Sequence, residues 1–341
     1  MNRELLNGII AALEGQASAN FAASDVNEAA ISAILKEAGL SENPTAREIR
    51  NNEAAIFSLI EEAVDEILPK KLENLLGAYA EVRTFARDAE VVFNIEKIGK
   101  NRAKLTISKG ARGGIYRAAR LDSKYFSPET SIQTVAVYVT LEELILGTMS
   151  LAELYANILE GFQEVIYKET FNALAAGVPA AGYNRIGEED STISTNKESL
   201  DDAIDAVMPF VKQYGVPTIF GSYEAVNGLY NPLASAGHIN AQDSMDIRNY
   251  GFVQMYKGVR VVELPNYLVD NSNEDWFYDP SYVFVIPSGV KPVKIALKGE
   301  LQIQRNAHAV GSEKWEAHKL IGVGLAMANN YAVIQVNELK K

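Results

Sequence analysis

The sequence of 341 residues predicts an α+β fold organised around one long helix. Apolar residues recur at helical spacing through residues 150–177, a length that corresponds to about 40 Å at the rise of an α-helix. Period-two alternation, typical of strands, appears at residues 134–140 and again near the C-terminus. A helix–strand–helix pattern covers residues 199–229. Because helices and strands occur in separate runs as well as in one alternating unit, the α+β class is favoured.

The composition excludes several classes of protein. Apolar residues make up 48% of the chain and charged residues 22%, which are ordinary values for a globular protein. The chain contains no cysteine, so neither a disulfide framework nor thiolate catalysis is available. No apolar run approaches the roughly 20 residues of a membrane helix, and no membrane partner is expected. The net charge of −12 argues against a dedicated DNA-binding protein, because phosphate contacts come from lysine and arginine.

Residues 1–85 are predicted to form a helical N-arm and not a compact domain. The alanine-rich first forty residues have a modest apolar stripe, and two interpretations remain open: surface helices on the same chain, or an arm that lies on another subunit. Thr45 and Glu48 form a capping box before a further helix. Pro69 is predicted to stop or kink this helix, with about two more turns following it.

Residues 91–108 predict a β-hairpin, since period-two alternation flanks the turn Gly99-Lys100-Asn101. Residues 97–124, called the basic loop here, contain nine basic residues and one acid, Asp122. The loop therefore carries +8 and the remainder of the chain −20. Charge segregation of this size predicts docking on an acidic surface of a neighbouring copy. The residues expected at this contact are Lys97, Lys100, Arg102, Lys104, Lys109, Arg112, Arg117 and Arg120.

Two alternatives for the basic loop stay open. It could be an ordinary solvated loop, or it could contact nucleic acid, for which the neighbouring aromatic residues are few. The glycine-rich stretch 109–114 resembles a phosphate-binding loop but lacks the Gly-Lys-Ser/Thr ending and the long helix behind it. It is interpreted as a flexible hinge at the base of the hairpin.

The long helix has start and stop signals. Ser150 and Glu153 form a capping box, Gly177 is a natural residue to follow the last turn, and Pro179 is expected to prevent continuation. The strand at 134–140 comes shortly before the helix and should give it a sheet to lie on. The helix is therefore expected to be the structural spine of the fold.

The second half of the chain predicts an α/β layer followed by strands. Asn231 to Asn249 is expected to be loop-like, Lys257-Gly258 to be a turn, and residues 266–280 to be an acidic, aromatic loop. The C-terminal strands 293–304 and 321–336 are expected to pair antiparallel through a loop at 306–319. The remaining predicted elements are a helix at 199–214, strands at 216–220, 252–256, 259–264 and 281–287, and a short helix at 222–229.

No catalytic, cofactor or metal site is predicted. The acidic loop lacks the spacing of a calcium loop, and the two histidines of the C-terminal region lack a zinc motif, so local hydrogen bonds are expected for them. The stretch 322–324 lacks the third glycine of a dinucleotide fingerprint, where Met327 stands instead. The function is therefore expected to lie in surfaces and not in an active site. The residues weighed and set aside as ligands are Asp270, Glu274, Asp275, Asp279, His308 and His318.

The order of these elements resembles that of the tailed-bacteriophage major capsid proteins with the Hong Kong 97-like fold. The resemblance is best at residues 91–108, 132–177 and 255–265, and the ending HKLIGVGLAMANNYAVIQV is similar to the last strand pair of that family. Element order carries this resemblance more than any single motif does.

The resemblance implies a division of the chain into four parts. These are a helical N-arm at 1–85, an extended β-hairpin loop at 86–120, a peripheral domain at 121–179 and 291–341 containing the spine helix 150–177, and an axial α/β domain at 180–290. A family member would be a structural protein and not an enzyme, without a cofactor. Copies would self-assemble through hexamers and pentamers into an icosahedral shell around the double-stranded DNA genome.

The resemblance also implies partners and a location. The expected partners are other copies of the chain, scaffold, portal and decoration proteins, and packaged DNA touched non-specifically at the inner surface. The expected location is the virion, after assembly in the cytoplasm of a bacterial host. Two other functions stay open: an encapsulin-like compartment with the same fold around cargo enzymes, and an unidentified soluble α+β enzyme. Cargo content would separate the first from a virus, and a monomer with a deep pocket would support the second.

Overall fold

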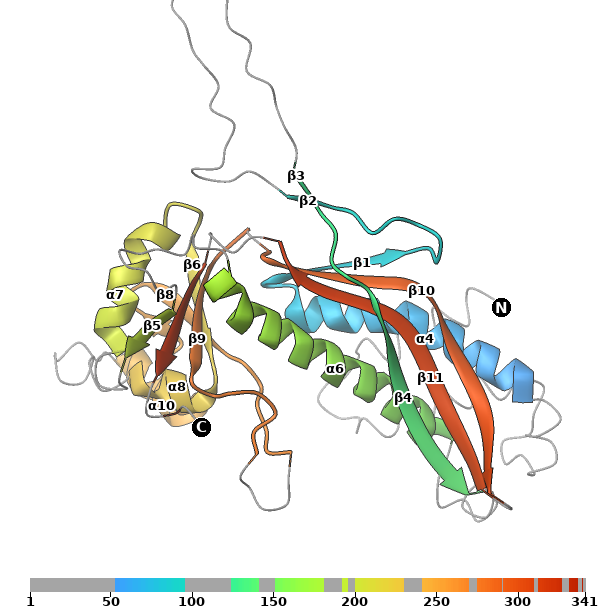
Figure 1. Cartoon of the computed structure of the whole chain (residues 1–341). Coiled ribbons are helices and arrows are strands. Elements are labelled where there is room, and N and C mark those ends of the chain that lie inside the picture. Colours follow the sequence, from blue (N-terminus) through green and yellow to red (C-terminus); the bar gives the residue numbers. More distant parts are fainter. Residues whose placement is uncertain are drawn as a thin grey trace, which may run out of the picture.

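Two large sheets and a long helix between them organise the described part of the chain (Figure 1). The structure is a computed structural model and describes residues 53–95, 124–140, 151–180, 192–195, 200–229, 241–269, 275–289, 291–309, 312–326, 331–336 and 339. The predicted helices of residues 1–52 and most of the basic loop lie outside these residues. The α+β class predicted from the sequence is confirmed.

The first sheet has four strands in the order β1-β10-β11-β4. Strand β1 is parallel to β10, and the other neighbours are antiparallel. The predicted C-terminal strand pair is confirmed, but the loop expected at 306–319 is wrong, since both strands run into it. The sequence of residues 306–319 is mostly polar, so it shows little of the apolar–polar alternation from which strands are predicted. The strands are β1 Ala80–Phe85, β4 Ser131–Thr140, β10 Val293–Ala309 and β11 Ser312–Leu325.

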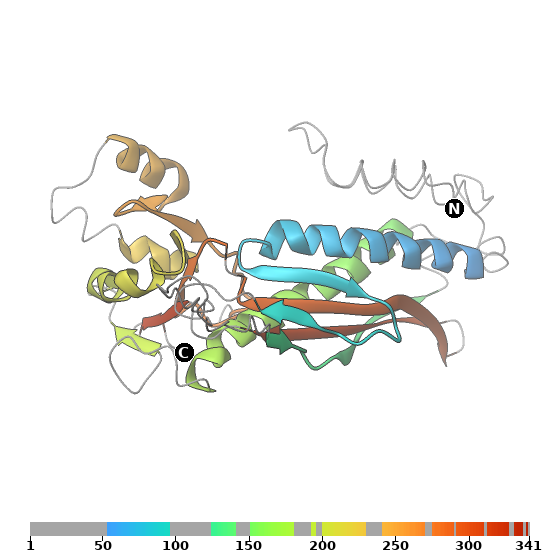
Figure 2. The same ribbon diagram turned by 90° about the horizontal axis from the view of Figure 1, so that it is seen from above.

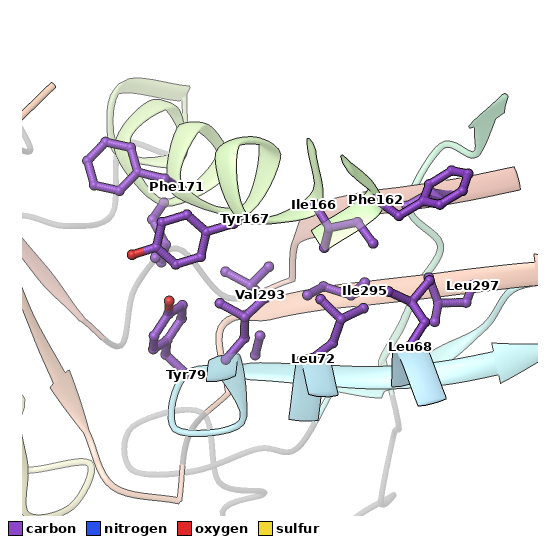
Figure 3. Close-up of a cluster of buried hydrophobic side chains, with 14 of the residues drawn as sticks. Leu68, Leu72, Tyr79, Phe162, Ile166, Tyr167, Phe171, Val293, Ile295 and Leu297 are labelled. Atoms are coloured by element: carbon purple, nitrogen blue, oxygen red, sulfur yellow. The ribbon is translucent and has the colours of Figure 1, made fainter. Parts of the chain in front are cut away.

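Two helices, α4 (Glu53–Leu76) and α6 (Leu151–Ala180), lie along this sheet (Figure 2). Alternate side chains of β10 point toward them, as strand geometry requires, and Val293, Ile295 and Leu297 fill the space between the helices (Figure 3). Full burial of each such side chain contributes about 1.5–3 kcal/mol of transfer free energy. The facing helix residues are Leu68 and Leu72 of α4 and Phe162 and Ile166 of α6.

Helix α4 continues through its proline and includes turns predicted after it, and α6 extends beyond its predicted end. Pro69 lies inside α4, which continues to Leu76, and α6 passes Gly177 and Pro179 to end at Ala180. A proline removes one backbone hydrogen bond, and in α4 the buried residues on either side of Pro69 offset that loss. The C-terminal half of α4 belongs to the main core.

Helix α6 connects the two sheets, which confirms its predicted role as the spine. Its N-terminal half packs on β4 and β11, and its C-terminal half packs on the second sheet. The Phe171 ring meets the Phe284 ring edge-on at 5.4 Å. The Tyr331 hydroxyl donates a hydrogen bond of 2.8 Å to the Leu174 carbonyl. One core cluster therefore includes residues from both sheets.

The second sheet has six strands in the order β5-β12-β9-β6-β8-β7. It contains β12, which follows β11 in the chain, so the single strand expected at 321–336 is two strands in different sheets. The turn at Lys257-Gly258 is confirmed, with φ of 48° and 78°. The strands are β5 Thr192–Thr195, β6 Pro217–Gly221, β7 Met255–Tyr256, β8 Val259–Glu263, β9 Tyr282–Pro287 and β12 Ala332–Val336.

The helices beside the second sheet match the predicted α/β layer with one exception. Helix α7 (Leu200–Val211) buries its predicted apolar face, and α8 (Tyr223–Val226) continues into the 3-10 turn η3 (Asn227–Leu229). The exception is α10 (Ala241–Tyr250), which lies where a loop was expected. Its sequence AQDSMDIRNY has too few apolar residues to form a recognisable stripe.

Candidate functional site

The base of the basic loop is a pair of short antiparallel strands. Strand β2 (Phe93–Ile95) pairs with β3 (Lys124–Phe126), with Phe93 opposite Phe126. The sequence predicted that residues 91–95 pair with residues 105–107, whereas the described partner of β2 is β3. Ile95, just before the basic loop, and Lys124, its last residue, therefore lie opposite each other. The eight residues predicted to contact a neighbouring copy, Lys97, Lys100, Arg102, Lys104, Lys109, Arg112, Arg117 and Arg120, lie outside the described residues.

The loop base is anchored on the face of the first sheet that points away from α4 and α6. Phe93 is fully buried and packs with Ala296, whose side chain points opposite to those of Ile295 and Leu297. The Phe85 ring meets the Phe93 ring edge-on at 5.5 Å. Two cations cover the same ring, with Arg83 at 5.5 Å and Lys294 at 6.0 Å from its centroid. The base of the loop is thus anchored by buried packing on the first sheet.

The anchor also contains an ion pair. The buried Lys294 ammonium donates a hydrogen bond to Glu81 of β1, and Arg83 lies 2.5 Å from the same carboxylate. Burial by itself would raise the pKa of Glu81, but the hydrogen bond and charge of Lys294, with those of Arg83, overcome this and hold the pKa below its ordinary value. Glu81 is therefore expected to stay ionised through mildly acidic conditions.

Helix α4 is fixed to a bulge in the first sheet by its carboxylates. The register of β10 against β11 shifts between Lys298 and Gln302, and Gly299 takes a φ of 72° there. The Leu301 N–H donates to Asp65 at 2.8 Å and the Ile303 N–H donates to Glu61 at 2.6 Å. These bonds satisfy backbone donors at and just beyond the shift. Sequence reasoning missed them, although a carboxylate spacing of four on one helix face was visible.

A groove lies between α6, the end of α4 and the residues Pro265, Tyr267 and Phe277, and it is called the acidic groove here. It encloses about 270 Å³. Three aromatic rings form its wall: the Tyr267 ring stacks on Phe277 at 4.7 Å, and Phe277 stacks on Tyr167 at 6.0 Å. The Tyr267 hydroxyl donates a hydrogen bond to Glu164 of α6. The lining residues are Leu75, Glu160, Gln163, Glu164, Tyr167, Pro265, Tyr267 and Phe277.

The side chains weighed as metal ligands make ordinary local contacts where they are described. Nδ1 of His318 lies 2.9 Å from the Thr134 hydroxyl, as expected of a histidine with a local hydrogen bond. Asp279 accepts a hydrogen bond of 2.9 Å from the Ser281 N–H. Asp270, Glu274 and the side chain of His308 lie outside the described residues. Within the residues described, His, Asp and Glu side chains do not gather in threes as a metal site.

A cavity of about 490 Å³ is lined by residues from β1, β4, β10, β11 and the turn after β1. Its charged lining side chains are Arg87, Lys298, Glu300 and Lys319, and Lys319 is paired with Asp65.

Among the helices that the structure describes, each is too short or too polar to span a bilayer.

Comparison with known proteins gives a family match over nearly the whole chain. Residues 3–335 match the family described as "SPbeta prophage-derived putative capsid protein YonB". No curated protein sequence matches the chain.

Solved structures give likenesses at low sequence identity. A chain of the satellite phage P4 procapsid that includes the size determination protein superposes with a TM-score of 0.54 at 12% identity, covering 84% of this chain and 97% of that chain. The mature capsid of bacteriophage PhiM1 gives 0.48 at 13% identity, covering 76% of this chain and 86% of that one. An encapsulin of Synechococcus elongatus gives 0.46 at 13%, covering 78% and 87%.

The P4 likeness shows the fold, and the family match covers far more than half of the sequence. The chain belongs to the SPbeta prophage-derived capsid protein family and is a phage major capsid protein with the Hong Kong 97-like fold.

Proposed function

We propose that copies of this chain self-assemble through hexamers and pentamers into an icosahedral shell that encloses a double-stranded DNA genome. The family match over residues 3–335 is the observation that carries this proposal. The likeness to the satellite phage P4 procapsid chain, which this chain covers to 97%, supports it. A shell of many copies gains its strength from avidity, because each single contact can be weak when many form together.

The contact between copies is made by the basic loop. Its residues Lys97, Lys100, Arg102, Lys104, Lys109, Arg112, Arg117 and Arg120 dock on an acidic surface of a neighbour. The buried Phe93 supports this assignment, because it fixes the base of the loop on the first sheet. The charge of −20 on the remainder of the chain supplies acidic surfaces for docking.

The division into an N-arm, an extended loop, a peripheral domain and an axial domain is part of the same proposal. In this division α4 and β1 belong to the N-arm at 1–85, and β4, α6, β10 and β11 belong to the peripheral domain at 121–179 and 291–341. Strands β5 to β9 with α7, α8 and α10 belong to the axial domain at 180–290. Strand β12 joins the axial sheet although it lies within residues 291–341. Scaffold, portal and decoration proteins, and DNA at the inner surface, are the further partners proposed for a virion assembled in a bacterial cytoplasm.

Negative-stain microscopy and light scattering of the protein expressed alone test the proposal. Closed shells or ring-shaped capsomers are expected. Nuclease treatment of particles from infected or induced cells then separates the two kinds of shell: protected double-stranded DNA is expected, whereas co-purifying enzymes without DNA would indicate a cargo compartment. A protein that remains monomeric at high concentration, with and without its neighbouring gene products, would contradict the proposal.

A further inference from the structure

We infer that the acidic groove of one copy is the receiving site for the basic loop of a second copy. This inference rests on the proposed function and names the acidic surface that the function leaves unspecified. The groove contains carboxylates that can pair with a cationic group and aromatic rings that can pack against the aliphatic part of the same side chain. A lysine or arginine side chain matches both.

The carboxylates of the groove face solvent. Glu160 and Glu164 lie one helical turn apart on α6, and both side chains are exposed. They oppose a loop of net charge +8. Charge complementarity between the two surfaces favours fast and specific association.

The apolar part of the groove is exposed as well. Leu75 is 45% exposed and Tyr267 is 46% exposed, which is unusual for large apolar side chains beside a core. The exposed Tyr267 ring stacks on the buried ring of Phe277, which in turn stacks on buried Tyr167, so the Tyr267 ring is supported from behind. Lys168 already lies 5.8 Å from the centroid of Phe277, so one cation of the same chain uses this aromatic stack.

The groove also contains an unsatisfied donor. The Nε2 atom of Gln163 is buried and makes no hydrogen bond in the described structure. A buried donor without a partner costs about 1–3 kcal/mol, so an acceptor brought by an incoming segment would relieve that cost. The backbone carbonyls of a docked loop are such acceptors.

A second copy must supply the loop. The loop base lies on the face of the first sheet opposite α4 and α6, because Phe93 packs with Ala296 while the groove is formed by α6 and the end of α4. The loop of the same chain would have to pass around the sheet to reach its own groove. A neighbour can approach the groove directly.

A labelled peptide of residues 97–124, titrated into the full-length protein, tests the inference by fluorescence anisotropy. The variant E160K/E164K is expected to bind the peptide at least about tenfold more weakly. Glu160→Lys alone leaves the bond between Tyr267 and Glu164 intact and should show part of the loss. The matched control D201K/D202K, with the same charge change on α7, should bind as the wild type does. Equal binding by all variants would overturn the inference.

Assembly gives a second, independent readout. Combining E160K/E164K with K100E/R102E/K104E in one chain should restore shells that either set of substitutions prevents, since the charges are exchanged between neighbours. If the wild type forms shells and E160K/E164K forms them equally well, the groove assignment fails and the capsid function stands. If the peptide binds in a groove-dependent manner while the wild type forms no shells, the capsid function fails and the groove assignment stands.

Discussion

The Lys319 ammonium of β11 donates a hydrogen bond of 2.5 Å to Asp65 of α4, across 254 residues of sequence. The same ammonium donates a second bond of 3.1 Å to the Gly299 carbonyl in the bulge of β10. The Lys319 side chain is only 3% exposed. The buried Lys319 ammonium therefore links α4 to β10 and β11, two strands of the first sheet.

Removal of the Asp65 carboxylate should destabilise the subunit severely. Asp65→Ala leaves a buried ammonium without its counter-ion and the Leu301 N–H without its acceptor, and the loss of a buried partner costs about 3 kcal/mol or more. Urea unfolding of the unassembled subunit, followed by tryptophan fluorescence, measures this cost. The neighbouring control Glu66→Ala breaks only a surface contact with Lys70 and should cost less than about 0.5 kcal/mol. Similar losses of unfolding free energy in the two variants would contradict the stabilising role of the buried Lys319–Asp65 pair.

Two carboxylates near the first sheet should respond to pH with opposite signs. Burial raises the pKa of Glu61, although the Ile303 N–H opposes this, whereas the pKa of Glu81 is held down by Lys294 and Arg83. A raised carboxyl pKa penalises folding above the ordinary value of 4.5, and a lowered pKa stabilises folding there. Glu61→Gln should therefore increase stability at neutral pH, and Glu81→Gln should decrease it.

The two differences should both shrink as the pH falls through the carboxyl range, because the wild-type groups become protonated and resemble glutamine. Urea midpoints of the wild type and both variants at about pH 7 and about pH 4 measure this. A gain for Glu81→Gln at neutral pH, or differences that do not change with pH, would refute the assignment.

Close contact between the spine helix and β4 should make Gly161 sensitive to size. A Cβ atom built on Gly161 would lie 2.9 Å from Cγ1 of Val135, closer than carbon atoms approach. Gly161→Leu should force α6 away from the sheet and cost about 1–3 kcal/mol. Val135→Ala makes room, so the double variant should be more stable than the sum of the two single losses predicts, by about 1 kcal/mol. Strict additivity would show that α6 does not pack there.

Charge reversal in the basic loop should impair assembly and leave the subunit folded. The variant K100E/R102E/K104E changes residues predicted to contact a neighbour, and the buried anchor at Phe93 is untouched. Shell yield by light scattering should fall, while the circular dichroism spectrum and the unfolding midpoint should stay at wild-type values. Normal particles from this variant would contradict the proposal that these three residues dock on a neighbouring copy.

The sequence predicted the strongly periodic elements and missed those defined by contact alone. Helices α6 and α7 and strand β4 were visible because their apolar residues repeat over many turns or pleats. Helix α10 was not, since its polar sequence gives no stripe. Strand β12 alternates as β11 does, and alternation cannot show that the two strands belong to different sheets.

The candidate site was predictable only in part. The charge of the basic loop is a property of composition, and it predicted contact residues without any structure. The acidic stretch 266–280 was also visible, and its carboxylates were weighed as metal ligands and set aside, but nothing in the sequence indicated the groove. The partners Tyr167 and Phe277 of the aromatic stack are far apart in the chain, so only the folded structure brings their rings together.

A cryo-electron microscopy reconstruction of the assembled particle tests the central claim most directly. The account predicts a closed icosahedral shell in which residues 97–124 of each copy lie in the groove formed by Glu160, Glu164 and Tyr267 of its neighbour. A purified protein that forms no closed particle under any assembly condition would contradict the capsid function. A shell in which this segment folds back on its own subunit would contradict the contact between copies.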